Sequence, residues 1–185
     1  MRIISGLHKG RKIKSSSDHS IRPTTDRVKE YIFNILQDFP VGKTVIDMFS
    51  GSGNLGIEAL SRGAEKIYFV EQALSSIAVL KDNLSALNIS SDKYEIIKMD
   101  ALHFAKTFNI EAQLCLLDPP FVYPPVQELL NHIFKNHILS ENGLLVLEHE
   151  VSNPIEDENP FYEILRRKKM GRSLISILGN KDDEK

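Results

Sequence analysis

The sequence predicts an α/β fold in which a parallel sheet is covered by helices on both faces. From residue 44 to residue 148, short apolar runs that suit buried strands alternate with longer segments whose apolar residues recur at helical spacing. The first apolar run leads directly into Gly51, Gly53 and Gly56, which have the spacing G-x-G-x-x-G. In a fold of this class, such a turn places a ligand at the carboxyl ends of the strands.

The elements follow one another in a regular order. Strands are expected at 45–49, 66–70, 94–98, 114–117 and 143–148, and the helices among them at 55–62, 74–87, 102–108 and 125–137. An earlier helix is expected at 25–37, with Thr24 as its N-cap. Its apolar stripe comprises Val28, Tyr31, Ile32, Ile35 and Leu36. Two more strands, at 161–167 and 173–178, are expected on either side of a turn at Gly171.

The glycine-rich turn predicts a site for a nucleotide-like ligand. A ligand that lies on such a loop must touch the backbone, and a Cβ atom would prevent this contact. The helix that begins near Asn54 also directs its free N–H groups towards that ligand. Glu71 ends the next strand, 20 positions after Gly51, where an acid accepts hydrogen bonds from both ribose hydroxyls. A nicotinamide cofactor satisfies the same pattern, so an oxidoreductase is an alternative.

An acidic residue inside the first strand argues against the nicotinamide alternative. Asp47 lies two residues before Phe49, where a dinucleotide-binding strand usually has only apolar residues. Its carboxylate can hold the loop backbone or face the amino group of a cationic amino-acid ligand. The pattern D-x-F-x-G-x-G resembles the S-adenosylmethionine loop of class I methyltransferases. Asp100 and Ala101 follow the third strand, where the acid can accept an adenine amine or cap the next helix.

The tetrapeptide Asp118-Pro119-Pro120-Phe121 directly follows the fourth strand. Its two prolines fix the backbone and remove two N–H donors, which leaves carbonyl oxygens free to accept hydrogen bonds. Acceptors on both N–H bonds of an aromatic exocyclic amine localise its lone pair for in-line attack on a sulfonium methyl, while an aromatic ring stacks on the base. We therefore predict that these four residues are catalytic; a simple turn is the alternative.

Several stretches together resemble one family. The D-P-P-F tetrapeptide is similar to the D/N-P-P-Y/F motif of amino-methyltransferases, and further matches lie at residues 2–6, 10–12, 22–27, 33–36 and 49–64. Nearly end to end, the chain resembles the bacterial 16S ribosomal RNA guanine-N2 methyltransferases named for guanine 966. It departs from the expected K-x-Y-G before the last strand, where Met170 replaces the aromatic residue.

This resemblance implies a Rossmann-like class I methyltransferase fold. The sheet would have seven mostly parallel strands with an antiparallel last strand, and helices on both faces. The methyltransferase domain would span residues 24–179, after a short basic N-terminal extension at 1–23 and before a frayed tail at 180–185.

The resemblance also implies the reaction. A methyl group would pass from S-adenosylmethionine to the exocyclic N2 amine of one guanine of 16S ribosomal RNA, in a 30S particle or an assembly intermediate, and the enzyme would be a monomer. The implied cofactor-binding residues are Asp47, Phe49, Gly51, Gly53, Glu71, Asp100, Ala101 and Asp118. An adenine-N6 DNA methyltransferase, which shares the D-P-P-F chemistry, and a non-catalytic RNA-binding module are the alternatives.

Charge is distributed unevenly along the chain. Residues 1–29 carry a net charge of +6 and the remainder −8, and Lys29 is among the basic residues of the first part. The expected RNA-binding residues are Arg11, Lys12, Lys14, Arg22 and Arg27. A solvated basic arm without a partner is the alternative.

Composition limits the class of protein to which the chain can belong. With 185 residues, of which 42% are hydrophobic, the chain can bury a sizeable core as one domain. The single cysteine, Cys115, lies in an apolar run, so we expect a buried thiol and a reducing, cytoplasmic compartment. No run approaches the roughly 18 apolar residues of a membrane span. The six histidines have no spacing that suggests a metal site.

Overall fold

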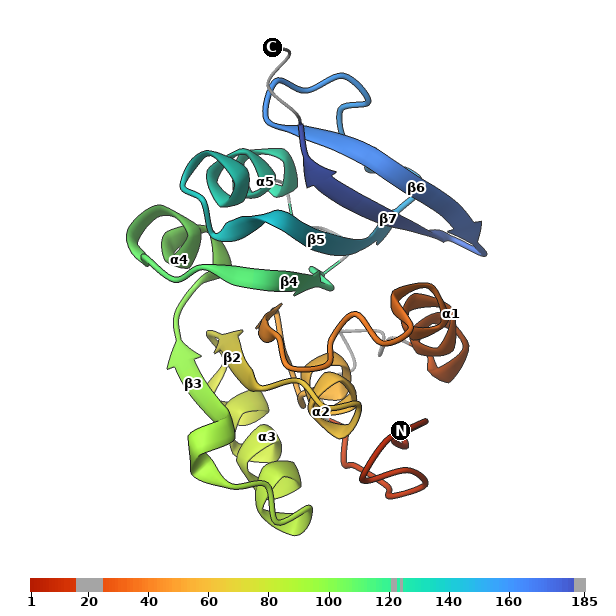
Figure 1. The fold of residues 1–185 in the computed structure, drawn as a ribbon, viewed down its shortest axis with the longest axis vertical. Helices are drawn as coiled ribbons and strands as arrows, with labels where there is room; N and C mark the ends of the chain where they lie inside the picture. The colour runs from red at the N-terminus through yellow and green to blue at the C-terminus, as the bar shows by residue number, and fades with distance from the viewer. Residues whose placement is uncertain (16–24, 121–122, 124, 182–185) are drawn as a thin grey trace.

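The computed structural model describes residues 1–15, 25–120, 123 and 125–181, which form one seven-stranded sheet with helices on both faces (Figure 1). The strands are β1 Thr44–Met48, β2 Lys66–Glu71, β3 Tyr94–Lys98, β4 Ala112–Leu117, β5 Leu139–Glu150, β6 Tyr162–Met170 and β7 Ser173–Asn180. The α-helices are α1 Asp26–Leu36, α2 Asn54–Ser61, α3 Leu74–Ala86, α4 Ala101–Thr107 and α5 Val126–Lys135. A short 3₁₀ turn, Ser91–Lys93, precedes β3. The predicted residues Arg22, Thr24 and Phe121 lie outside the described part.

The sheet topology confirms the predicted fold class. The strand order is β3-β2-β1-β4-β5-β7-β6. Strands β1 to β5 pair in parallel, whereas β7 runs antiparallel between β5 and β6. The direction of strand addition reverses between β1 and β4, and in open α/β sheets this reversal creates a ligand crevice at the carboxyl ends of the strands.

Alternating side chains of the strands build two apolar cores, one on each face of the sheet. Ile46 and Met48 face the core beneath α4 and α5, whereas Val45 faces the core that contains residues of α1, α2 and α3. Cys115, in the first of these cores, is fully buried as predicted, and burial raises the pKa of its thiol to about 12. No helix in the described residues has the length and apolar character needed to cross a membrane.

The first helix differs in detail from its prediction. The N-cap is Thr25 and not Thr24, because the Thr25 hydroxyl accepts a hydrogen bond from the backbone N–H of Val28 at 3.3 Å. The buried face is also rotated relative to the expected stripe. It comprises Val28, Lys29, Ile32, Phe33 and Leu36, whereas Tyr31 and Ile35 are only half-buried. A lysine therefore occupies a position on the core side of this helix.

The N-terminal residues fold against the domain. Residues 1–13 form an irregular hairpin in which Arg2 bridges to Lys12 and the backbone N–H of Ile3 bonds to the carbonyl oxygen of Arg11 at 2.9 Å. Ile3 and Ile13 are buried in the core that contains residues of α1, α2 and α3. At Gly6, with φ +81°, a Cβ would lie 1.7 Å from the carbonyl oxygen of Ser61, so only glycine permits this close approach to α2.

Candidate functional site

The residues of the predicted site lie at the carboxyl ends of neighbouring parallel strands, and the strand register aligns these ends. Leu117 of β4 pairs with Met48 of β1, and Met48 pairs with Val70 of β2. The residues that follow these three are Asp118, Phe49 and Glu71, so they lie at one level on adjacent strands, about 5 Å apart from strand to strand. The structure therefore brings together the beginning of D-P-P-F, the glycine-rich loop and the acid that ends the second strand.

The loop between β1 and α2 is held by the carboxylate of Glu71. This carboxylate accepts hydrogen bonds from the backbone N–H groups of Gly51 at 2.9 Å and Ala73 at 2.8 Å. Each carboxylate oxygen can accept a second bond, so both can also receive ribose hydroxyls. Gly51 has φ +54°, and a Cβ built there would meet only the carbonyl oxygen of Phe49, at 3.9 Å. The loop surface at Gly51 is thus free of side chains.

Two other glycines of the motif are required for packing. Gly53 is the N-cap of α2 with φ 86°, and a Cβ there would lie 2.5 Å from the side chain of Leu80. A Cβ on Gly56 would lie 2.4 Å from the ring of Phe69. Both contacts are too short for any larger residue without movement of the core, so these glycines set how closely α2 approaches its neighbours.

The sequence left two roles open for Asp47, and the structure shows one of them. Its carboxylate, 2% exposed, accepts a hydrogen bond from the backbone N–H of Gly56 at 2.8 Å. This bond fixes the first turn of α2 to β1. Burial raises the pKa of Asp47 to about 7, and the nearby Glu71 adds to this effect, while the bond from Gly56 opposes it.

The raised pKa of Asp47 predicts a stability that depends on pH. Between about pH 4 and pH 7 the folded state binds more protons at this group than the unfolded state, so the free energy of unfolding should fall as the pH rises. Asp47→Asn keeps an acceptor oxygen for Gly56 and should reduce this slope. Urea unfolding of both proteins at pH 4.5, 5.5 and 7 measures the slopes, and equal slopes would contradict the assignment.

The remaining predicted site residues lie at the same edge of the sheet. Asp100 caps α4 by accepting a hydrogen bond from the backbone N–H of His103 at 3.0 Å, and Ala101 is the first, buried residue of that helix. Asp118 is half-buried and the following Pro119 is buried. The ring of Phe49 meets that of Tyr123 edge to face, with 4.8 Å between centroids. Tyr123 thus joins the site without having been predicted.

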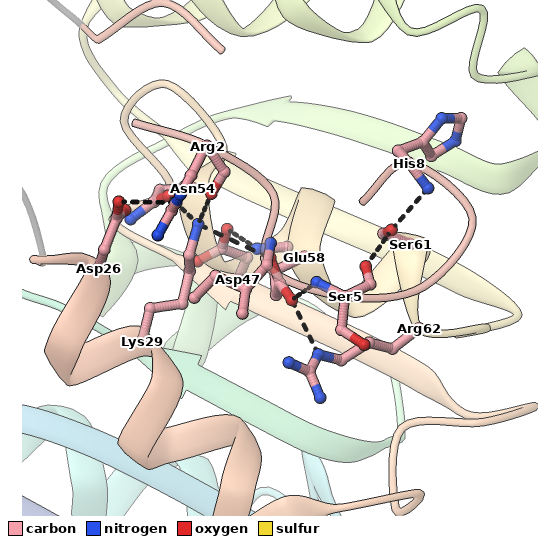
Figure 2. Close-up of polar contacts among 12 residues, drawn as sticks. Arg2, Ser5, His8, Asp26, Lys29, Asp47, Asn54, Glu58, Ser61 and Arg62 are labelled. Carbon is pink, nitrogen blue, oxygen red and sulfur yellow. Dashed lines mark hydrogen bonds and ion pairs between the residues drawn. The ribbon is translucent and has the colours of Figure 1, made fainter. Parts of the chain in front are cut away.

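A buried lysine contacts the first residue of α2, directly after this loop (Figure 2). The ammonium group of Lys29 donates to the side-chain oxygen of Asn54, the first residue of α2, at 2.8 Å, and to the carbonyl oxygen of Arg2 at 2.7 Å. It also lies 3.7 Å from a carboxylate oxygen of Glu58, and both side chains are completely buried. Desolvation lowers the pKa of Lys29, and the neighbouring Glu58 opposes this shift.

Glu58 connects the N-terminal hairpin to α2. It accepts hydrogen bonds from the backbone N–H groups of Ile4 at 2.8 Å and Ser5 at 3.1 Å, and from the guanidinium of Arg62 at 2.8 Å. Sequence reasoning counted Lys29 with the basic end of the chain and did not anticipate this network. The signals were present, because Lys29 lies three residues before the buried Ile32 and Glu58 interrupts an otherwise mostly apolar helix.

The four described residues of the predicted RNA-binding set, Arg11, Lys12, Lys14 and Arg27, are exposed, but two of them contact α3. The guanidinium of Arg11 donates to the carbonyl oxygen of Ala86 at 2.7 Å, and Lys14 forms a 2.8 Å ion pair with Asp82. Such exposed contacts are weak and can exchange for a phosphate. Lys12 and Arg27 are exposed as well. The structure thus leaves these four side chains accessible to a polyanion.

One side chain links this basic segment to the glycine-rich loop. The amide of Asn83, on α3, donates to the carbonyl oxygens of Lys14 at 3.0 Å and Ser52 at 2.9 Å, and its oxygen accepts from the backbone N–H of Lys14 at 2.9 Å. Ser50, in the same loop, has a buried hydroxyl for which the described residues offer no hydrogen-bond partner. An uncompensated polar group in this loop suits a ligand that supplies the missing bond.

Comparison with known proteins agrees with this geometry. Residues 1–179 match the family model described as conserved hypothetical protein 95. The chain belongs to this family. It is 37% identical over 174 residues to ribosomal RNA small subunit methyltransferase D of Haemophilus influenzae, covering 92% of this chain and 89% of that protein. For the protein of the same name from Escherichia coli K12, the identity is 32% over 172 residues, covering 93% and 86%.

Solved structures of similar proteins share the fold of this chain, and one of them is the methyltransferase yhhF from Escherichia coli. Its solved structure superposes with a TM-score of 0.87 and 30% sequence identity, covering 99% of each chain. The structure of HI0767 from Haemophilus influenzae gives a TM-score of 0.83 at 33% identity, covering 98% and 99%. Both alignments span the sheet, both helical layers and the N-terminal hairpin, so the fold as a whole is that of class I methyltransferases.

Proposed function

We propose that this chain is an S-adenosylmethionine-dependent methyltransferase that modifies the exocyclic N2 amine of a guanine in 16S ribosomal RNA. The observation that carries the proposal is the alignment of Asp118, Phe49 and Glu71 at one level of adjacent strands, beside a loop free of side chains at Gly51. Relatives named ribosomal RNA small subunit methyltransferase D, which match nearly the whole chain, support the substrate class.

The residues around the loop fit the cofactor. S-adenosylmethionine, when bound, supplies a sulfonium methyl group. Glu71 would accept the two ribose hydroxyls, because its oxygens retain lone pairs beyond those used by Gly51 and Ala73. Asp100 would accept the adenine amine, since a carboxylate has several acceptor positions and the bond from the backbone N–H of His103 uses one of them. Phe49, Gly51, Gly53 and Ala101 would line the bound molecule, and Asp47 would keep the loop in place through Gly56.

The D-P-P-F residues would hold the target base. Asp118 and the carbonyl oxygen of Pro119 would accept the two N–H bonds of the guanine amine, which localises the lone pair on nitrogen. Phe121 would stack on the base. The bound cofactor would supply the methyl group: an N–C bond would form as the S–C bond of the sulfonium broke, the thioether would leave, and the proton of the methylated amine would pass to solvent. Each of these roles depends on orientation more than on charge, because the amine must lie in line with the methyl group.

The position of the guanine and the state of the substrate are also proposals. The family resemblance favours the position named for guanine 966 and a substrate that is a 30S particle or an assembly intermediate. A monomer in the cytoplasm is consistent with this role. Arg11, Lys12, Lys14, Arg22 and Arg27 would contact the phosphates of the RNA, at the N-terminal end of the chain.

The experiment that tests the proposal measures transfer of labelled methyl from S-adenosylmethionine to 30S particles that lack the modification. Nucleoside analysis should show N2-methylguanosine at a single site. Naked 16S ribosomal RNA and duplex DNA serve as competing substrates. Methylation of adenine in duplex DNA would favour the DNA methyltransferase alternative, and RNA binding without any transfer would favour a non-catalytic module.

A further inference from the structure

We propose that the hairpin of β6 and β7 is a second contact surface for the RNA backbone, in addition to the N-terminal basic residues. This inference rests on the proposed RNA substrate. Five of the seven residues from Arg166 to Arg172 are basic, in a chain whose formal net charge is −2. None of them belongs to the predicted RNA-binding set, so they form a separate concentration of positive charge.

Most of this charge is exposed and uncompensated. Arg166, Lys168 and Lys169 are exposed, and within the described part of the chain no ion pair involves them. The other two are paired, Arg167 with Asp157 and Arg172 with Glu150, each at 2.6 Å. Asp157 and Glu150 are thus occupied by the other two cations, which leaves Arg166, Lys168 and Lys169 for an external partner.

The strand register places these cations near the proposed catalytic residues. Lys168 pairs with Ile175 of β7, which pairs with Glu148 of β5. Because Leu147 pairs with Leu117, Glu148 is at the level of Asp118. Lys168 therefore lies at the level of Asp118, three strand positions away, or about 14 Å at the usual spacing. Figure 1 agrees, since the arrowheads of β4, β5 and β6 point to the same side.

The distance suits one RNA strand that contacts both places. A strand of duplex DNA advances about 3.4 Å per nucleotide, so an RNA segment of only a few nucleotides can span the distance from Asp118 to Lys168. Phosphate contacts of this kind orient the strand and carry no sequence information. The hairpin would thus hold the phosphates that flank the target guanine while the D-P-P-F residues hold its amine.

Protection of the sheet edge against pairing with another molecule explains the cluster of basic residues less well than RNA binding does. β6 is an edge strand, and exposed charges on such strands prevent pairing with another molecule. One or two charges of either sign suffice for that purpose. Here the cations are adjacent and near the carboxyl end of β6, whereas Glu163 lies near the opposite end. A partner with regularly spaced negative charges accounts for both the sign and the place.

The test compares two pairs of exposed lysines. Lys168→Gln with Lys169→Gln removes two charges from the hairpin, and Lys81→Gln with Lys135→Gln removes two elsewhere. All four lysines are exposed, and none forms an ion pair with another described residue. We expect the hairpin pair to weaken binding of 16S ribosomal RNA about threefold to tenfold at roughly 0.1 M salt, and to reduce the slope of log affinity against log salt by about one to two. KM for RNA should rise with little change in kcat.

The controls separate this inference from the proposed function. Unchanged affinity for S-adenosylmethionine shows that the variants are folded. If the wild-type chain methylates RNA but both lysine pairs change affinity and salt slope equally, the hairpin is not a contact surface. If the wild-type chain neither binds nor methylates ribosomal RNA, the proposed function itself is refuted.

Discussion

Replacing Glu58 with glutamine should lower the free energy of unfolding by about 3 to 5 kcal/mol, the usual cost when one partner of a buried ion pair is removed. Glu58 and Lys29 are both completely buried, and their charged atoms lie 3.7 Å apart. The substitution leaves the ammonium group of Lys29 without its counter-charge and close to the guanidinium of Arg62, which already lowers its pKa. Urea unfolding at pH 7 measures the loss.

A second variant identifies the cause of that loss. Lys29→Met together with Glu58→Gln removes both charges and keeps the side-chain volumes, so it should recover a large part of the stability. The Glu58→Gln protein alone should become more stable as the pH rises towards 10.5, the ordinary pKa of lysine, because burial lowers the pKa of Lys29 and its folded state then binds fewer protons there than its unfolded state does. A loss below about 1 kcal/mol, or a double variant no better than the single one, would show that the pair is not coupled.

A third variant, Lys29→Met alone, tests the support of the loop between β1 and α2. Lys29 donates to Asn54 at the start of α2, directly after Gly53, while Asp47 accepts from Gly56 two residues later. The first turn of α2 is therefore held both by α1 and by β1. If this support positions the loop, Lys29→Met should weaken affinity for S-adenosylmethionine even at temperatures where the protein stays folded.

The sequence predicted the features that depend on local spacing. The G-x-G-x-x-G loop, the acid at Glu71 and the alternation of strands and helices follow from positions along one chain segment, and the structure contains all of them. The choice between Asp47 as a loop anchor and as a ligand contact could not be made from spacing. It depends on which backbone N–H comes to face the carboxylate, and α2 brings Gly56 there.

The sequence did not predict contacts between distant segments, because such contacts depend on the three-dimensional fold. Lys29 and Glu58 are 29 positions apart, and nothing in either helix alone shows that the two meet. Thr24 and Thr25 can both cap a helix, and the three-dimensional fold selects the second. The hairpin cations were visible in the sequence, but their relation to Asp118 depends on the insertion of β7 between β5 and β6.

Asp118→Ala should reduce the rate of methyl transfer at least a hundredfold while affinity for S-adenosylmethionine changes less than about threefold. Losing one hydrogen-bonding group aimed at the reacting atoms commonly lowers kcat by about 10² to 10³. Asp118 follows β4, whereas the loop is held by the Glu71 carboxylate at the end of β2. The Asp118→Ala substitution therefore leaves intact the hydrogen bond that Glu71 accepts from Gly51. Single-turnover transfer to 30S particles measures the rate, and equilibrium dialysis measures cofactor affinity.

The companion variants decide what Asp118 contributes. Asp118→Asn keeps an acceptor oxygen and removes the charge, so it should retain more activity than Asp118→Ala if acceptance of an amine hydrogen is the role. Asp38→Ala, which removes an exposed acid in the turn after α1, should transfer methyl groups at the wild-type rate. Turnover of Asp118→Ala within about threefold of wild type would contradict the assignment. Equal losses in the alanine and asparagine variants would instead indicate that one acceptor oxygen is not sufficient and that the complete carboxylate is required.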